Sequence, residues 1–188
     1  MQHSTKKTEI LDFAQELIQR RGYNGFSYAD VSQAVGIRKA SIHHHFPSKE
    51  DLAVAVVRRY RDTFVSCLAK IAVEEKDWLN KIHQYAKLYE AVLNEDRLCL
   101  CGMLASDIDT LPRVLKKEIR KFFADNVEWL SQILSLQYPA MANKQLNNIS
   151  WQIISSLQGA VIMARMLDKP EVFTSASKEL FTYLGSMK

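Results

Sequence analysis

The chain has 188 residues, of which 47% are hydrophobic and 24% are charged; this ordinary globular composition excludes a disordered chain and allows one sizeable core or two small ones. The net charge is +4, but the excess is local, because residues 1–61 hold 10 Lys and Arg against 6 Asp and Glu while the rest hold 15 against 15. A localised cationic excess is expected of a module that binds phosphate groups, although Arg58 and Arg59 alone fit a solvated helix face equally well.

The first residues, MQHSTKKTE, are polar and lack the apolar stretch of a signal peptide, and no window of 18 or more apolar residues occurs. We therefore expect a soluble, cytoplasmic protein. Apolar residues then recur at helical spacing from Ile10 to Ile18. They predict a first helix that ends before Gly22, with Arg20 and Arg21 favourably placed in its last turn.

Residues 27–52, SYADVSQAVGIRKASIHHHFPSKEDL, predict two short helices around a tight turn, followed by the start of a third. Ser27 is a natural N-cap for the first of them. The apolar residues expected on its buried face are Val31, Ala34 and Val35. Gly36 then ends this helix, because glycine adopts a left-handed backbone without strain from a Cβ atom. A three-residue turn, Val35 to Ile37, is the layout of a helix-turn-helix DNA reader.

The second helix of this motif is anchored by Ile42 and Phe46 and carries polar residues outward. One α-helix fits the major groove, where Arg, Lys, Ser and His donate to base edges and phosphate oxygens. The outward residues are Arg38, Lys39, Ser41, His43 and His44. Consecutive histidines point about 100° apart on a helix and cannot converge on a metal ion, so we predict no metal site. His45, if it faces inward beside Phe46, is a packing residue.

Residues 47–50 stop this helix and start another, with Ser48 as N-cap and with Glu50 and Asp51 favourable in the first turn. Lys49 is unusual there, because a cation at a helix N-terminus opposes the helix dipole. The cost is small, and it makes sense if a phosphate lies nearby, held by the ammonium group and the free backbone N–H groups.

Across residues 8–60 the chain resembles the TetR family of bacterial transcriptional regulators. The matching elements are Gly22-Tyr23, Ser27, Val31-Ser32, Val35-Gly36-Ile37, the stretch from Arg38 to Phe46, and Lys49-Glu50-Asp51-Leu52. By this resemblance the DNA-contacting positions are Ser27, Lys39, Ser41, His43, His44 and Lys49. Tyr28 and Arg38 complete our set of candidate contacts. Two positions depart from the family pattern: His43 replaces a common tyrosine that touches the DNA backbone, and Ala40 replaces a common glycine.

Helical periodicity continues through the rest of the chain. Apolar residues from Leu52 to Ile71 predict a long helix over about residues 50–72, which leaves the DNA-binding domain and enters a second region. Further helices are predicted over 78–93, 115–134, 144–167 and 171–187. With the resemblance, this predicts an all-α chain of about nine helices: a three-helix DNA-binding domain, residues 1–50, and a helical ligand-binding and dimerisation domain, residues 51–188.

The predicted C-terminal domain holds mid-helix aromatic and sulfur residues, which can enclose a small apolar ligand or simply form core. The candidate pocket residues are Trp78, Tyr85, Tyr89, Cys99, Met103, Phe123, Trp129, Trp151 and Met163. The segment 98–112 is predicted to be a loop with one or two helical turns. Cys99 and Cys101 there are either small buried hydrophobes or accessible, reactive thiols that sense oxidants or electrophiles. With Cys67 they are too few for a disulfide framework, which suits a reducing compartment.

No Walker loop, nucleotide-binding glycine fingerprint, nucleophile elbow or catalytic carboxylate pair occurs, so we predict neither an enzyme nor a cofactor. The resemblance implies a homodimer formed through the last two helices. Dimerisation also has a physical reason, because two copies about 34–36 Å apart read successive major-groove faces of a palindrome. We predict a repressor that a small ligand releases from a palindromic operator. The alternatives are a thiol-based redox or electrophile sensor and a constitutive DNA-binding protein without a ligand.

Overall fold

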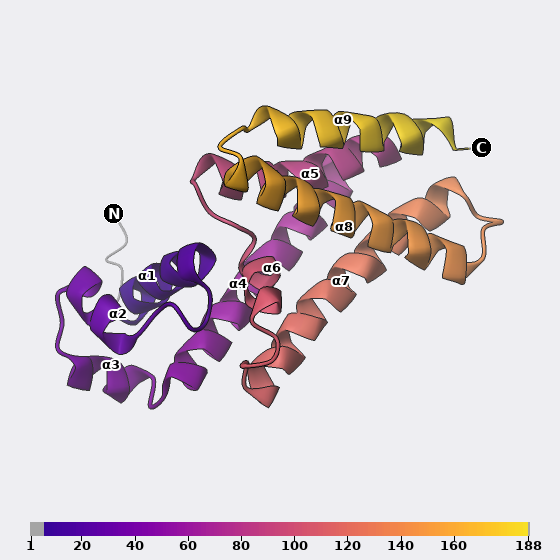
Figure 1. Ribbon diagram of the computed structural model, residues 1–188. Coiled ribbons are helices and arrows are strands. Elements are labelled where there is room, and N and C mark those ends of the chain that lie inside the picture. The colour runs from indigo at the N-terminus through magenta and orange to yellow at the C-terminus, as the bar shows by residue number, and fades with distance from the viewer. Residues whose placement is uncertain (1–5, 188) are drawn as a thin grey trace. The chain divides into compact units, whose positions relative to one another are not determined.

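The computed structural model describes residues 6–187, and this part of the chain forms nine α-helices and no strand (Figure 1). The helices are α1 (Lys6–Arg21), α2 (Tyr28–Val35), α3 (Lys39–His45), α4 (Lys49–Glu74), α5 (Trp78–Asn94), α6 (Leu100–Ser106), α7 (Arg113–Gln137), α8 (Asn143–Met166) and α9 (Glu171–Ser186). The all-α prediction with about nine helices is confirmed. None of these helices combines the length and apolar composition of a bilayer-crossing segment. The first five residues of the polar N-terminal stretch lie outside the described residues.

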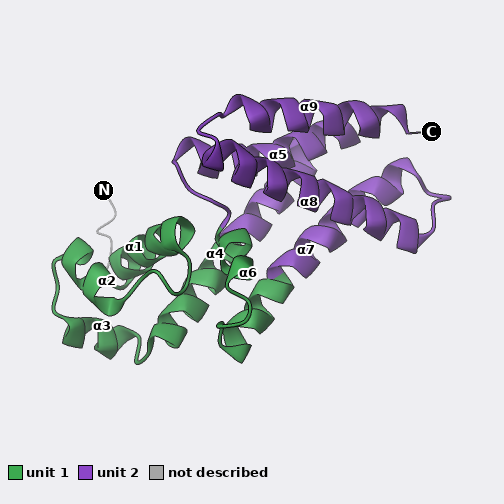
Figure 2. Cartoon of the chain, viewed as in Figure 1, with its two compact units in different colours: residues 1–62, 100–121 green, residues 63–99, 122–188 purple. Residues whose placement is uncertain are grey.

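Two compact units divide the chain (Figure 2). Unit 1 comprises residues 1–62 and 100–121, and unit 2 comprises residues 63–99 and 122–188. Helices α4 and α7 therefore each run from one unit into the other. Unit 1 contains the expected DNA-binding region, residues 1–50, and also the start of α4, α6 and the first turns of α7. Where the DNA-binding domain ends as a functional module remains a prediction.

The core of unit 1 is mainly apolar and joins α1, α2, α3 and the first turns of α4. Its most deeply buried side chains include Ile10, Ile18, Val31, Ile42 and Leu52. Burying each such side chain contributes roughly 1.5–3 kcal/mol to stability. The expectation for Ala34 is wrong, because this residue is exposed. The buried face of α2 consists of Tyr28, Val31 and Val35. Around the helix axis, Tyr28 and Val35 lie on the side of Val31 opposite to Ala34, so Ala34 falls outside this face.

The core of unit 2 is aromatic and contains buried polar groups. Phe64 of α4 and Phe122 of α7 are in edge-to-face contact, with ring centroids 5.0 Å apart. The Tyr85 ring stacks on the Trp129 ring at 5.7 Å. The Tyr85 hydroxyl lies 2.9 Å from the Tyr89 hydroxyl and donates to Asn126 Oδ1 at 2.8 Å. Burial raises the pKa of Tyr85 above its usual range, so this hydroxyl stays protonated and is a permanent donor.

Candidate nucleic-acid interface

Local side-chain caps build the turn between α2 and α3. The backbone N–H of Ser27 donates to the Asp30 carboxylate at 2.8 Å, and the Ser27 hydroxyl accepts from the Asp30 N–H at 3.4 Å. The Ser27 hydroxyl also donates to Asp30 Oδ2 at 2.6 Å, and this bond, together with the one from the Ser27 N–H, lowers the pKa of Asp30. Gly36 then ends α2 at φ 69° and ψ 35°, a left-handed conformation that favours glycine. The predicted N-cap at Ser27 and helix end at Gly36 are both confirmed.

Helix α3 has one buried anchor and an exposed polar surface. Ile42 is fully buried, whereas the candidate DNA contacts on and before the helix are exposed. These exposed candidates are Arg38, Lys39, Ser41, His43 and His44. His45 is exposed, so the condition under which it would be a packing residue is not met. The backbone leaves the helix at Phe46, with φ −140° and ψ 102°, and Phe46, unlike the three histidines before it, is buried.

Tyr28 occupies a different environment from the other candidate contacts. It is buried, and its hydroxyl donates to the Phe46 carbonyl at 2.6 Å. Burial, together with the charge of Asp51, raises the pKa of Tyr28 to about 12. Its ring packs edge-on against His43 at 4.6 Å, while His43 Nδ1 lies 3.0 Å from the Pro47 carbonyl oxygen. Tyr28 is therefore placed to position His43, since its own hydroxyl is already used within the protein.

The start of α4 has the predicted cap and an unexpected site for its lysine. The Ser48 hydroxyl accepts from the Asp51 N–H at 3.1 Å, and the Ser48 N–H donates to the Asp51 carboxylate at 3.0 Å. Lys49 Nζ lies 4.6 Å from the Tyr23 ring centroid and 4.7 Å from that of Phe26. Burial lowers the pKa of Lys49, and the nearby carboxylates partly offset this. Cation–π contacts worth about 0.5–1 kcal/mol each thus compensate for a cation at this helix start, and a phosphate contact for Lys49 remains a prediction.

Helix α6 and the loop after it contact the segment between α1 and α2. Asp107 Oδ2 accepts a hydrogen bond from the Tyr23 N–H at 2.7 Å, and Asn24 Nδ2 donates to Thr110 Oγ1 at 2.8 Å. Gly22 has φ +74°, and a Cβ atom there would lie 2.6 Å from Asp107 Oδ2, so glycine is required for this approach. The contact was not predictable from the sequence, because its partners are 84 and 86 residues apart and no local pattern joins them.

The nine candidate pocket residues do not share one environment. Tyr85, Tyr89 and Cys99 are buried in unit 2, whereas Trp151 and Met163 of α8 are each 52% exposed. The other four, Trp78, Met103, Phe123 and Trp129, are partly buried, and Met103 belongs to unit 1. For Trp151 and Met163 the expectation of an enclosed pocket wall is therefore wrong within one chain. Tyr85, Tyr89 and Trp129 do come together in the aromatic core.

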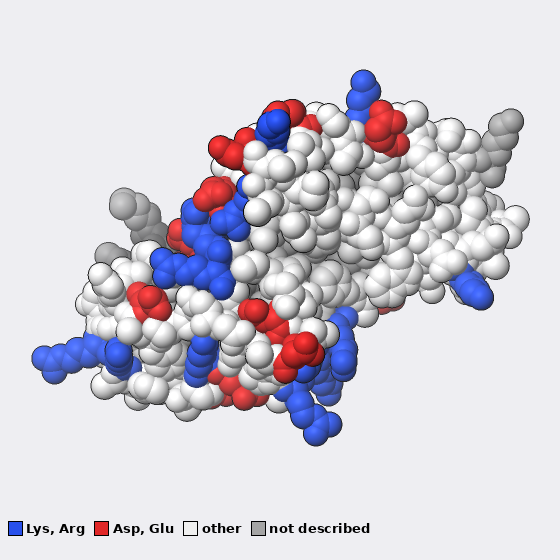
Figure 3. Space-filling view, in the orientation of Figure 1, with Lys and Arg blue, Asp and Glu red and all other residues white. Residues whose placement is uncertain are grey.

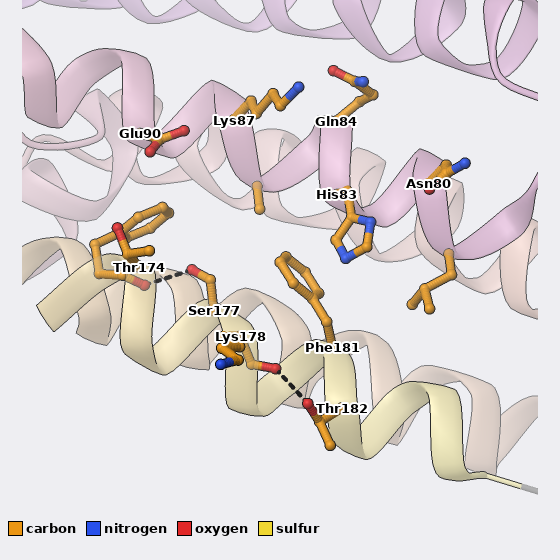
Figure 4. A pocket seen from close by; sticks show the side chains of 13 residues that line it. Asn80, His83, Gln84, Lys87, Glu90, Thr174, Ser177, Lys178, Phe181 and Thr182 are labelled. Atoms are coloured by element: carbon orange, nitrogen blue, oxygen red, sulfur yellow. Dashed lines mark hydrogen bonds between the residues drawn. The ribbon is translucent and has the colours of Figure 1, made fainter. Parts of the chain in front are cut away.

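A hollow of about 730 Å³ lies between α5 and α9 (Figure 4). The His83 and Phe181 rings pack edge to face there, with centroids 4.0 Å apart and ring planes at 90°. None of the nine candidate pocket residues is among those that line it. In the close view the Lys87 and Gln84 side chains point away from α9, so the hollow has few polar groups converging on one point.

The cysteines do not meet the requirement of the sensor hypothesis. Cys99 is 1% exposed and Cys101 is fully buried, and neither forms a disulfide within the described residues. Cys101 lies within α6, not in a loop. Of the two alternatives, the burial supports small core residues and not accessible thiols, because α6 continues the buried apolar pattern of the segment before it. These two cysteines behave as small core residues.

An exposed apolar surface covers parts of α8 and α9, which pack along each other in unit 2 (Figure 1). The large apolar side chains exposed on these helices and just after α8 are Trp151, Ile162, Met163, Met166, Leu167 and Tyr183. Exposed apolar side chains mark an interaction site in many proteins where they form one patch. We call this set the α8–α9 apolar surface.

Known proteins share this architecture and parts of this sequence. A family model described as bacterial regulatory proteins, tetR family, matches residues 10–56. The chain is similar to a TetR transcriptional regulator from Legionella pneumophila, with 34% identity, 97% of this chain and 99% of that chain covered, and a TM-score of 0.91. A TetR-family regulator from Agrobacterium tumefaciens is 32% identical, with 95% and 96% covered and a TM-score of 0.89. The negative transcriptional regulator IcaR of the icaADBC biofilm operon, from Staphylococcus aureus, is 25% identical over 64% of this chain and 70% of its own length.

Proposed function

We propose a function for this chain on the basis of its family: it belongs to the TetR family of bacterial regulatory proteins, which are DNA-binding transcriptional regulators and not enzymes. We infer that it binds a palindromic operator as a homodimer and represses transcription there, in the cytoplasm. We further infer that a small molecule bound in unit 2 releases the operator.

The observation that carries the DNA-binding proposal is the exposed face of α3. A buried Ile42 fixes the helix, and the side chains around it offer hydrogen-bond donors and positive charge to solvent. Lys39 and Ser41 lie near the N-terminal end of α3, the part of a reading helix that contacts base edges. The contact of His43 with the Pro47 carbonyl supports a role for His43 at a phosphate oxygen. The Ser27 hydroxyl donates to Asp30 Oδ2 at 2.6 Å, so a phosphate contact through this hydroxyl would replace that bond.

We propose repression, and not activation, partly from the name of one relative. The name of the Staphylococcus aureus relative describes a negative transcriptional regulator. A dimer that covers a palindrome also excludes other proteins from that stretch of DNA. Both points support repression.

The α8–α9 apolar surface supports the dimer. Its exposed aromatic, branched and methionine side chains are the types that supply binding energy when an interface buries them. Two reading heads are needed because one short helix contacts only a few base pairs. The family usually joins its protomers through the last two helices, which are the helices that carry this surface here.

The interior of unit 2 supports an effector. The Nε1 atom of Trp129 and the Nε2 atom of Gln158 are buried donors without a hydrogen-bond partner among the described residues. Buried donors of this kind are normally satisfied, so a small molecule with hydrogen-bond acceptors suits them. Trp129 stacks on Tyr85 in the aromatic core, which suits a ligand with a flat apolar part.

Release of the operator is proposed to be a population shift. An effector that prefers dimers with wrongly spaced reading heads lowers the fraction that can bind both half-sites, and by linkage the operator must weaken effector binding equally. The chain passes between the units within α4, between Cys99 and α6, and within α7. The segment that returns to unit 1 through α6 accepts a hydrogen bond at Asp107 from the Tyr23 N–H. Movement of α6 would therefore shift the segment before α2.

Selection of bound duplexes from random DNA tests the DNA-binding proposal. The full chain should enrich a palindrome with half-sites one helical turn apart. Its affinity should fall by about 10³-fold or more between 50 and 200 mM salt if the dimer makes about six phosphate contacts. Lys39→Ala should change the preferred sequence if Lys39 reaches a base, whereas Lys144→Ala, an exposed lysine of unit 2, is the matched control. Enrichment of no sequence at low salt would exclude an operator-binding regulator.

A further inference from the structure

The excess of positive charge lies in unit 1, and it is not confined to the helix-turn-helix motif. The segments of unit 1 hold 15 Lys and Arg against 10 Asp and Glu, and those of unit 2 hold 10 against 11. Residues 100–121 alone hold five basic residues against three acidic ones. All five basic residues lie in the first three turns of α7, and this run is not part of the helix-turn-helix motif.

Four of these residues form what we call the α7 basic patch. It consists of Arg113, Lys116, Lys117 and Arg120, which with Val114 line a surface hollow of about 750 Å³. The spacing of three, four and seven residues places them on one side of the helix. Seven residues at 1.5 Å rise span about 10 Å, which matches two or three phosphates of one DNA strand at 3.4 Å axial spacing.

The charges of the α7 basic patch are not used within the described part of the protein. The nearby carboxylate, Glu118, is 3% exposed and already accepts from Arg58 at 3.0 Å and from Lys121 at 3.1 Å. Burial alone would raise the pKa of Glu118, but the hydrogen bonds from Arg58 and Lys121 outweigh it and lower the pKa. No ion pair joins the four patch residues to a residue within 6–187.

The location of these cations is unfavourable for the helix itself. The first turn of α7 contains no acidic residue, although the N-terminus of a helix favours anions and disfavours cations. Lys49 shares this unfavourable position in α4, but two aromatic rings compensate it. The α7 basic patch has no such compensation within the described residues, and this points to an external anion.

The α7 basic patch belongs to the same compact unit as the reading helix. The Arg58–Glu118 pair ties the first turns of α7 to α4, which begins directly after α3. Within unit 1, α3, the start of α4 and the start of α7 lie along the lower edge of the view (Figure 2). Lys and Arg side chains gather around the beginning of α7 in the same view (Figure 3). The DNA duplex that α3 contacts is therefore the anion that we expect the α7 basic patch to bind.

We propose that the α7 basic patch is a second DNA-binding surface, which holds backbone phosphates of the operator without reading its sequence. The proposal rests on the proposed function, since it takes α3 to be in contact with DNA. It extends the contact beyond the helix-turn-helix motif to a segment more than 60 residues further along the chain. Lys and Arg without hydrogen-bond partners suit phosphate oxygens, which accept from both.

The test removes three charges from the patch. In the full-length variant Arg113→Gln/Lys117→Gln/Arg120→Gln, affinity should fall for every duplex alike. The slope of log affinity against log salt should become shallower by about 0.9 for each phosphate that the variant no longer neutralises, and thus by about 5 for six phosphates per dimer. The preferred sequence in a selection should stay the same. Thermal melting should occur at the same or a higher temperature, because the substitutions remove cations from a helix N-terminus.

A control variant separates the patch from net charge. Lys144→Gln/Lys169→Gln/Lys178→Gln removes the same charge from exposed positions of unit 2 and should leave the salt slope unchanged. Equal slopes for wild type and the patch variant, or equal changes in patch and control variants, would overturn the proposal. A changed sequence preference in the patch variant would overturn the phosphate-only role. If the wild type itself binds no duplex, the proposed function fails; if wild type binds and the patch variant matches it, only this inference fails.

Discussion

The two compact units differ in what they place on their surfaces. Unit 1 has a mainly apolar core, in which the polar side chains of Gln19 and Glu118 are also buried, and it places most of its cations on the surface, around α3 and the start of α7. Unit 2 buries a hydrogen-bonded group in its core, the hydroxyl of Tyr85 with Asn126, and exposes apolar side chains on α8 and α9. The first pattern suits a charged partner met at the surface, and the second suits a second protomer outside and a small molecule inside.

The largest effect is expected from the anchor of α3 in unit 1. Ile42→Ala removes a fully buried side chain and should lower the free energy of unfolding by about 2–5 kcal/mol, with loss of DNA binding as α3 loosens. Urea denaturation and duplex titration measure the two effects. Ile162→Ala, at a half-exposed position of α8, should cost much less stability in the monomer. Similar losses of stability in the two variants would contradict the contrast between the buried anchor of α3 and the exposed surface of α8.

The next effect concerns the α8–α9 apolar surface of unit 2. Met163→Glu places a charge on this surface and should weaken the dimer by at least about 2 kcal/mol, or about 30-fold in Kd. Analytical ultracentrifugation measures the dissociation. Leu136→Glu, at an exposed apolar position of α7, is the matched control and should leave the dimer intact. A Met163→Glu protein that remains as dimeric as the control would show that this surface does not join the protomers.

A smaller effect is expected from the buried polar group of unit 2. Tyr85→Phe leaves the buried Asn126 Oδ1 without its donor and should lower the free energy of unfolding by about 1–3 kcal/mol. Tyr183→Phe, which changes an exposed tyrosine of α9, should change it very little. Thermal and urea unfolding compare the two variants. Equal stability of the two would mean that the hydroxyl network contributes nothing to this core.

The smallest effect concerns Lys49, which has partners within unit 1. Lys49→Ala should weaken all duplexes alike and lower the salt slope by about 0.9 per protomer, one phosphate contact. It should also reduce stability by about 1 kcal/mol through removal of the Tyr23 and Phe26 ring contacts. Salt-dependent titrations and urea denaturation separate these results. An unchanged slope with reduced stability would show that Lys49 acts only within the protein.

The features of unit 1 that depend on nearby residues were predictable from the sequence. Ser27 and Ser48 cap helices through side chains three positions away, and Gly36 ends α2 by its own backbone freedom. The expectation that failed, burial of Ala34, concerns a helix of about two turns. In such short helices the packing of a neighbouring element, not periodicity, decides which side is buried.

The features of unit 2 depend on distant residues and were less predictable. Helix α8 is apolar on more than one side, so its sequence does not distinguish a face toward the core from a face toward solvent. Trp151 and Met163 were therefore expected in a pocket and are exposed. The contact between Asp107 and Tyr23 in unit 1 has the same origin, because 84 residues separate its partners. The basic residues of α7 were visible in the sequence, but their relation to the reading head required the fold.

A titration of the wild-type chain with two duplexes tests the central claim most directly. One duplex carries the selected palindrome, and the other has one half-site scrambled. We predict that a dimer binds the intact palindrome at least about 10²-fold more tightly at about 150 mM salt, because a scrambled half-site removes several base contacts worth about 1–3 kcal/mol each. Equal affinity for the two duplexes would contradict a dimeric reader that places α3 of each protomer on DNA.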